Sequence, residues 1–235
     1  MQLRFETRGS DSSWVSEVWS CTSERVTEMT SVAGVSVGLV FWRQDGRAYA
    51  GVTGPETAAG TAPVPEGAAF VGIELAVGVS LAAVPTPSLV DAGLELPGAT
   101  HRFFRLAGDR WETPGPDDAE ALVDRLVRSG ALVRDPLVAE VRRGGRPEVT
   151  PRTLERRFRT ATGLAQGAVR QIERAREASA LLSRGKPVAD VVTGLGYFDE
   201  PHLARALRRY VGRTPRQLRD GAPGAIALDL AQPTS

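Results

Sequence analysis

The sequence predicts an α+β protein with a β-rich N-terminal domain, residues 1–115, and an all-α domain, residues 116–220. The first observation is a change of hydrophobic period from 2 to 3.6 residues after Pro114-Gly115-Pro116. The second is a division of charge: residues 1–133 hold ten arginines and seventeen acids, whereas residues 134–220 hold nineteen basic and ten acidic residues. A basic half joined to an acidic half indicates a polyanionic partner for the basic half alone.

A β-hairpin is predicted near the middle of the N-terminal domain. Residues 35–42 form an apolar run rich in β-branched and aromatic side chains. Asp45-Gly46 follows this run, and such a pair is the strongest short hairpin signal. Residues 48–52 are therefore expected to return as the partner strand.

A second apolar stretch covers residues 70–84, and Gly72 and Gly78 within it are expected to mark bulges or a bend. Prolines and glycines separate the short candidate strands of this half. Short strands divided by such turns predict a small barrel or a sandwich.

Helical spacing governs the C-terminal domain. Apolar residues recur on one stripe, and Ser, Thr, Asp, Pro and Gly stand where helices start and stop. The expected helices cover residues 117–129, 136–143, 150–162, 166–183, 187–195, 199–210 and 214–218. Residues 221–235 are rich in Ala, Pro and Gly and are expected to form a flexible tail.

Two of these helices, residues 150–162 and 199–210, share the same sequence pattern. Each opens with a good N-cap, Thr150 or Asp199, and has a proline in its first turn. Their apolar stripes consist of Leu154, Phe158, Leu203, Leu207 and Tyr210, and the opposite faces carry Arg152, Arg156, Arg159, Arg205 and Arg208. A helix that packs its apolar face on the protein and exposes arginines on the opposite face can enter the major groove of DNA. One such helix could equally be a solvated basic face, but the matched pair favours DNA.

These segments resemble a known family. Residues 195–219, with the turn Gly196-Tyr197, an arginine at position 205 and the closing Gly-x-Thr-Pro at 212–215, resemble the C-terminal signature of AraC/XylS-type transcription regulators. Residues 150–163 are similar to the first recognition helix of that family, and residues 175–185 look like its linker helix. The resemblance covers roughly residues 117–220.

The resemblance implies two helix-turn-helix units, joined by one helix, that place reading helices in successive major grooves. The family's base-reading positions fall on Arg152, Glu155, Arg156, Glu200, Pro201 and Arg205, with His202 adjacent. Phosphate contacts are expected from Thr150, Arg159, Arg208, Arg209 and Arg213. A proline side chain cannot donate a hydrogen bond, and Glu155 and Glu200 could equally hold neighbouring arginines.

The chain departs from the family pattern in the first unit. Its turn, residues 144–149, is about three residues longer than usual. We therefore expect this unit to dock loosely, and a protein that reads mainly through its second unit is an alternative.

The N-terminal domain carries a weaker resemblance. Residues 72–78 and 89–91 look like the β-rich domain of one subgroup of these regulators, which usually binds an effector or dimerises and is often cupin-like. A candidate effector pocket would use Trp14, Trp19, Phe41, Trp42, Tyr49 and Glu74. The alternative is that these side chains are core and rim residues.

Composition argues against several other classes of protein. Cys21 is the only cysteine, and His101 and His202 are the only histidines, so Cys and His cannot assemble a zinc site. The sequence contains no P-loop, no nucleophile elbow and no H-E-x-x-H. We expect no enzyme activity, no cofactor and no bound metal.

The resemblance therefore implies sequence-specific transcription regulation. We expect the protein in the cytoplasm, because no apolar run is long enough for a membrane span and the N-terminus lacks the basic and apolar blocks of a signal peptide. The expected partners are double-stranded operator DNA, a small-molecule effector, a second copy of the chain and, for an activator, RNA polymerase, but no membrane. The alternative function is a protein-interaction module whose helix-turn-helix domain no longer binds DNA.

Overall fold

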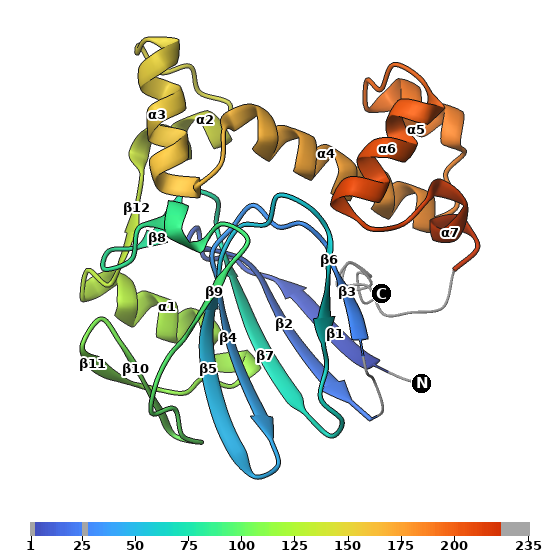
Figure 1. The fold of residues 1–235 in the computed structure, drawn as a ribbon. Coiled ribbons are helices and arrows are strands. Elements are labelled where there is room, and N and C mark those ends of the chain that lie inside the picture. The colour runs from blue at the N-terminus through green and yellow to red at the C-terminus, as the bar shows by residue number, and fades with distance from the viewer. Residues whose placement is uncertain (1–2, 25–27, 222–235) are drawn as a thin grey trace.

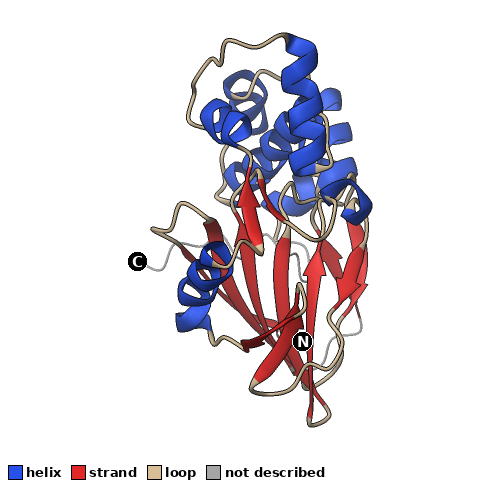
Figure 2. Cartoon of the chain, turned by 90° about the vertical axis from the view of Figure 1, so that its left-hand side faces the viewer, coloured by secondary structure: helices blue, strands red, loops and turns tan. Residues whose placement is uncertain are grey.

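The computed structural model describes residues 3–24 and 28–221 (Figure 1). A strand-rich N-terminal region is followed by a helical C-terminal region, which confirms the predicted α+β class. Figure 2 shows most of the helices gathered at one end of the molecule and the strands at the other, with one helix lying beside the strands. The predicted flexible tail, residues 221–235, lies outside the described residues except for Gly221.

The largest element is a six-stranded antiparallel sheet in the order β1-β2-β7-β4-β5-β9. Its strands are β1 Leu3–Gly9, β2 Val15–Ser23, β4 Gly38–Gln44, β5 Arg47–Thr53, β7 Ala69–Leu75 and β9 Gly93–Glu95. The predicted hairpin is confirmed as β4–β5. Asp45 and Gly46 occupy its turn with φ of 49° and 71°, the left-handed backbone that a tight hairpin needs.

Three short strand pairs surround this sheet. They are β3 Glu28–Ser31 with β6 Gly60–Pro63, β8 Val79–Leu81 with β12 Leu132–Arg134, and β10 Phe103–Leu106 with β11 Asp109–Glu112. Two 3-10 turns complete this region. The turn η1 Thr86–Leu89 follows β8, and the turn η2 Pro116–Asp118 follows β11.

The two glycines predicted to distort the second apolar stretch behave differently. Gly78 has a φ of 89° in the turn between β7 and β8, so a bend is present there. The expectation of a bulge at Gly72 is wrong, because its register with Trp19 and Val40 is regular. A Cβ atom at Gly72 would lie 1.9 Å from Cε2 of Trp19, so this glycine makes room for the indole.

One face of the sheet packs against α1 (Ala119–Arg128). Leu39 and Ile73 from the sheet and Leu122 and Leu126 from α1 are all almost fully buried in one cluster. The strand β12, which follows α1, pairs back onto β8. The packed unit around the sheet therefore extends beyond the Pro-Gly-Pro segment at residues 114–116.

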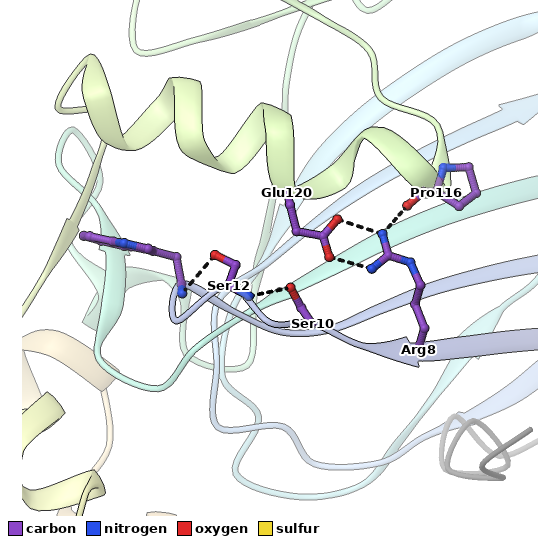
Figure 3. Close-up of polar contacts among 6 residues, drawn as sticks. Arg8, Ser10, Ser12, Pro116 and Glu120 are labelled. Atoms are coloured by element: carbon purple, nitrogen blue, oxygen red, sulfur yellow. Dashed lines mark hydrogen bonds and ion pairs between the residues drawn. The ribbon is translucent and has the colours of Figure 1, made fainter.

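An ion pair at the molecular surface ties α1 to the edge of the sheet (Figure 3). Arg8 of β1 presents both terminal nitrogens to the carboxylate of Glu120, with Nη2 2.7 Å from Oε2. Arg8 also donates to the carbonyl oxygen of Pro116 at 2.6 Å. The start of α1 is thus held to β1 through side-chain and backbone acceptors together.

The remaining helices follow the predicted ranges closely. They are α2 Pro136–Arg142, α3 Pro151–Thr162, α4 Gln166–Ser183, α5 Val188–Gly194, α6 Glu200–Tyr210 and α7 Pro215–Arg219. Ile172, Leu182, Leu203 and Leu207 form the centre of a second core. Among the described residues, no helix is long and apolar enough to cross a membrane.

Candidate nucleic-acid interface

The helix α3 is built as its sequence predicts. The hydroxyl of Thr150 accepts a hydrogen bond from the backbone N–H of Thr153 at 3.2 Å, which caps the first turn. Phe158 is buried, whereas Arg152 and Arg156 are exposed. The arginine face is therefore free to meet a ligand in solution.

The helix α6 repeats this construction. The carboxylate of Asp199 accepts from the N–H of His202 at 2.7 Å, and Pro201 stands in the first turn. Leu203 is fully buried, while Arg205 is exposed. Arg208 and Arg209 are also exposed, and Arg213 beyond the helix is half-buried.

The helix α4 connects the two arginine-faced helices. Figure 1 shows α3 at one end of α4 and α6 at the other. With about 1.5 Å of rise per residue, its 18 residues span about 27 Å. Equivalent points in successive turns of DNA are about 34 Å apart, so a helix of this length separates two readers on the scale of one turn.

Both arginine-faced helices meet the N-terminal region at their C-terminal ends. The carbonyl oxygens of Arg209 and Tyr210 accept hydrogen bonds from the N–H groups of Ala59, at 2.7 Å, and Ala33, at 2.9 Å. Such terminal carbonyls have no partner within their own helix, so the N-terminal region satisfies them.

The end of α3 is placed in the same way. Its C-cap Gly163 has a φ of 69°, and a Cβ there would lie 2.4 Å from Cγ2 of Val90. The helix therefore ends against the segment that follows η1. The contacts just described lie at the C-terminal ends of α3 and α6, whereas Arg152 and Pro201 near their N-terminal ends are exposed.

Residues 146–221 match the model of a helix-turn-helix domain family. This part of the chain is an AraC-type helix-turn-helix domain. No curated protein and no solved structure matches the chain significantly. Domains of this family are regulatory domains that bind DNA in transcription regulation. The predicted resemblance is thereby confirmed for residues 146–221.

Two of the predicted reading residues make contacts within the AraC-type domain. Oε1 of Glu155 accepts from Nε of Arg159 at 3.0 Å, and its Oε2 lies 3.4 Å from the N–H of Gln166 at the start of α4. His202 is half-buried, with Nδ1 accepting from the N–H of Phe198 at 3.2 Å. These contacts give both side chains a structural part, in line with the alternative that the sequence left open for Glu155.

Internal contacts hold the helices of the first unit together, while its expected loose docking on DNA stays a prediction. Arg142 at the end of α2 forms an ion pair with Glu173 of α4, with 2.6 Å between Nη2 and Oε1. Val138 of α2 and Phe158 of α3 are both buried in one small cluster. The start of the long turn is bonded back to α2, because the N–H of Gly145 donates to the carbonyl oxygen of Glu140 at 3.0 Å.

The six candidate effector residues do not gather in one place. Phe41 lies in the core below the sheet, in edge contact with Phe104 at 5.0 Å between ring centroids. Its neighbour Trp42 lies on the other face, because successive strand residues point to opposite sides. The guanidinium of Arg134 lies over the ring of Trp14, with 4.3 Å between Cζ and the ring centroid.

The remaining four share the second face of the sheet, as the register of β2, β7, β4 and β5 places Trp19, Trp42, Tyr49 and Glu74 there. Trp42 stacks on Tyr49 with 5.0 Å between ring centroids. Two cavities of about 230 and 320 Å³ are lined by other residues: the first by β8, β9 and β10 with their flanking loops, the second by α2, α3 and α4.

A charged cluster joins this face to α4. Burial raises the pKa of Glu74, and the neighbouring Glu17 raises it further, while Arg176 of α4 and a hydrogen bond from Trp19 lower it. Burial also raises the pKa of Glu17, and Arg176 again opposes the shift. Nη1 of Arg176 is 3.3 Å from the carbonyl oxygen of Ala33, to which it donates.

No pattern in the sequence predicts this contact between the two regions. Arg176 is one of many arginines in the basic half, and its partner Ala33 contributes only a backbone oxygen. The same holds for the N–H groups of Ala33 and Ala59 that bind α6. Backbone donors and acceptors are common to almost all residues, so no side-chain pattern marks them.

A metal site and a reactive thiol are two other kinds of site that Cys, His and acidic side chains can form. Among residues 3–24 and 28–221, no group of three or more His, Cys, Asp or Glu side chains is arranged to hold a metal ion. Cys21 is buried, and burial raises the pKa of its thiol to about 11. A thiol in this state is a poor nucleophile at neutral pH.

Proposed function

We propose that this protein is a sequence-specific transcription regulator that reads two neighbouring major grooves with the N-terminal ends of α3 and α6. The observation that carries the proposal is the matched placement of the two helices. Each has a capped N-terminus and an exposed arginine face, and each ends against the N-terminal region. Helix-turn-helix proteins contact base edges with the N-terminal residues of the reading helix, which are the ends left undocked here.

The arginines divide into two groups by their position. Arg156 and Arg205, with Arg152 next, are assigned to base edges, where a guanidinium can bind guanine O6 and N7 together. Thr150, Arg159, Arg208, Arg209 and Arg213 are assigned to phosphates, which set register without reading sequence. Glu200 is exposed at the first position of α6 and can accept from a cytosine amino group.

Glu155 and His202 contribute less than the arginines to the reading of bases. Each already has a hydrogen-bond partner inside the domain, and breaking that contact would offset the benefit of a base contact. Their role is to hold Arg159 and the start of α6 in position for the DNA.

The N-terminal region is proposed to be the regulatory domain, and its boundary is placed near residue 135, because α1 and β12 pack with the sheet. Effector binding or dimerisation would use the face that carries Trp19, Trp42 and Tyr49. Arg176 of α4 lowers the pKa of Glu74 on this face, so a ligand bound there would act on the helix that connects α3 and α6.

The test is selection of bound sites from random double-stranded DNA with the full chain, followed by binding measurements over a range of salt. We expect one enriched sequence with two half-sites about one helical turn apart. The logarithm of the binding constant should fall with the logarithm of salt by about 0.9 per phosphate contact. A protein that retains no DNA even at low salt would instead be an interaction module with a silent helix-turn-helix domain.

A further inference from the structure

Phe198 is the most exposed large apolar side chain of the described residues. The residue is 90% exposed, whereas the other exposed large apolar residues reach 36–43%. It stands immediately before Asp199, the N-cap of α6. An aromatic ring turned outward at the end of a reading helix is available to contact whatever that end of the helix binds.

The local sequence would allow this ring to be buried. A hydrophobic residue just before an N-cap commonly packs on the fourth residue of the helix, which here is Leu203. Leu203 is fully buried, and Tyr197, only 5% exposed, belongs to the same core cluster. Since Tyr197 already lies in this core, Phe198 points into solvent.

The outward position of Phe198 is well defined. Its N–H donates to Nδ1 of His202 at 3.2 Å, and the ring of His202 meets the ring of Tyr197 edge-on at 5.2 Å. The guanidinium of Arg174 in turn lies 4.3 Å from the centroid of Tyr197. Phe198 is therefore presented by an ordered turn rather than by a loose loop.

The neighbours of Phe198 are the exposed residues at the start of α6. Glu200, Pro201 and Arg205 are all exposed there. The major-groove edges of the four bases carry hydrogen-bonding groups, and their one apolar group is the 5-methyl of thymine. Phenylalanine is among the side chains that contact this methyl group.

We propose that Phe198 contacts the 5-methyl group of a thymine at the edge of the half-site read by α6. The inference rests on the proposed DNA-binding function and adds a base preference to it. Phe198 compensates for Pro201, which cannot donate a hydrogen bond from the same end of the helix.

The experiment uses the site selected by the wild-type protein and replaces each thymine in turn by deoxyuridine, which pairs identically but lacks the methyl group. For wild-type protein we expect about a three- to fivefold weaker Kd at one thymine of the second half-site, the effect of one buried methyl-sized group. Phe198→Ala should weaken binding to unmodified DNA by a similar factor and make the protein indifferent to deoxyuridine at that position.

Phe103→Ala is the matched control, because Phe103 is 36% exposed on β10, far from α6 in the chain, and its loss should leave every Kd unchanged. Thermal unfolding of Phe198→Ala should match wild type, since the ring is almost free of contacts. If the variant binds as tightly as wild type, or still distinguishes thymine from deoxyuridine as wild type does, the inference is overturned. Weaker binding to the selected site by Arg205→Ala in parallel would show that the DNA-binding proposal survives such a result. Absence of DNA binding by wild type would overturn both.

Discussion

The carboxylate of Asp135 and the guanidinium of Arg157 join α2 to α3, with 2.7 Å between Oδ2 and Nε. The other oxygen of the same carboxylate caps α2 by accepting from the N–H groups of Leu137 at 2.9 Å and Val138 at 3.1 Å. One side chain thus starts the first helix of the unit and holds the reading helix beside it.

Replacing Asp135 by alanine should lower the free energy of unfolding by about 1–3 kcal/mol, because a helix cap and an ion pair are lost together. Urea denaturation would measure the loss. Asp135→Asn keeps an acceptor for the cap and removes the charge, so it should cost less than alanine. Equal stability of wild type and Asp135→Ala would contradict a structural role for this contact.

The two classes of arginine on α6 should respond differently to mutation. Arg205→Ala should weaken binding to the selected site by about 1–3 kcal/mol and relax one base position, because a base contact is removed. Arg208→Ala should weaken binding to all sequences alike and reduce the salt slope by about one. Fluorescence anisotropy with selected and scrambled DNA separates the two effects, and identical behaviour of both variants would refute the assignment.

Gly72 should not tolerate a side chain. A Cβ would lie 1.9 Å from the indole of Trp19, so Gly72→Ala must displace that ring and should destabilise the protein by about 1–3 kcal/mol. Thermal unfolding and tryptophan fluorescence report the stability and the displacement. Gly60→Ala is the control, because nothing lies within 4 Å of its Cβ position. A Gly72→Ala protein as stable as the Gly60→Ala protein would contradict the packing described.

The Arg8–Glu120 pair should make stability depend on pH in the acid range. The hydrogen bond from Arg8 lowers the pKa of Glu120 from 4.5 to about 2 in the folded protein. A carboxyl whose pKa falls on folding stabilises the protein above its unfolded pKa, and the contribution is lost as pH falls toward its folded pKa.

Both side chains are partly exposed, at 41% for Arg8 and 27% for Glu120, so we expect a contribution of only about 0.5–1 kcal/mol at neutral pH. Glu120→Gln should therefore be less stable than wild type above pH 4.5, and the difference should vanish as the pH approaches 2. A difference that stays constant across this range would show that the ion pair is not its cause.

Arg176 should couple the sheet face to α4. Arg176→Met should destabilise the protein, because the positive charge that opposes the raised pKa of Glu74 is removed. Glu74→Gln in the same background should recover part of the loss, with a coupling of about 0.5–2 kcal/mol in a double-mutant cycle. Additive effects of the two substitutions would exclude an interaction between these side chains.

Most of the helical half could be predicted from the sequence by itself. The caps at Thr150 and Asp199, the apolar stripes and the stopping glycines are local features, and local rules place them within one or two residues. The arginine faces followed directly, because a side chain opposite a buried stripe is exposed. The hairpin at Asp45-Gly46 was predictable for the same reason, since its turn needs only two residues with positive φ.

The tertiary structure alone decided how these parts meet. It placed α1 and β12 with the sheet, separated Phe41 from Trp42, and joined Ala33 and Ala59 to the end of α6. It also showed that Tyr197 is buried and Phe198 exposed, although both are aromatic neighbours in one turn. These outcomes depend on backbone hydrogen bonds and on competition for space between distant segments, neither of which leaves a periodic pattern in the chain.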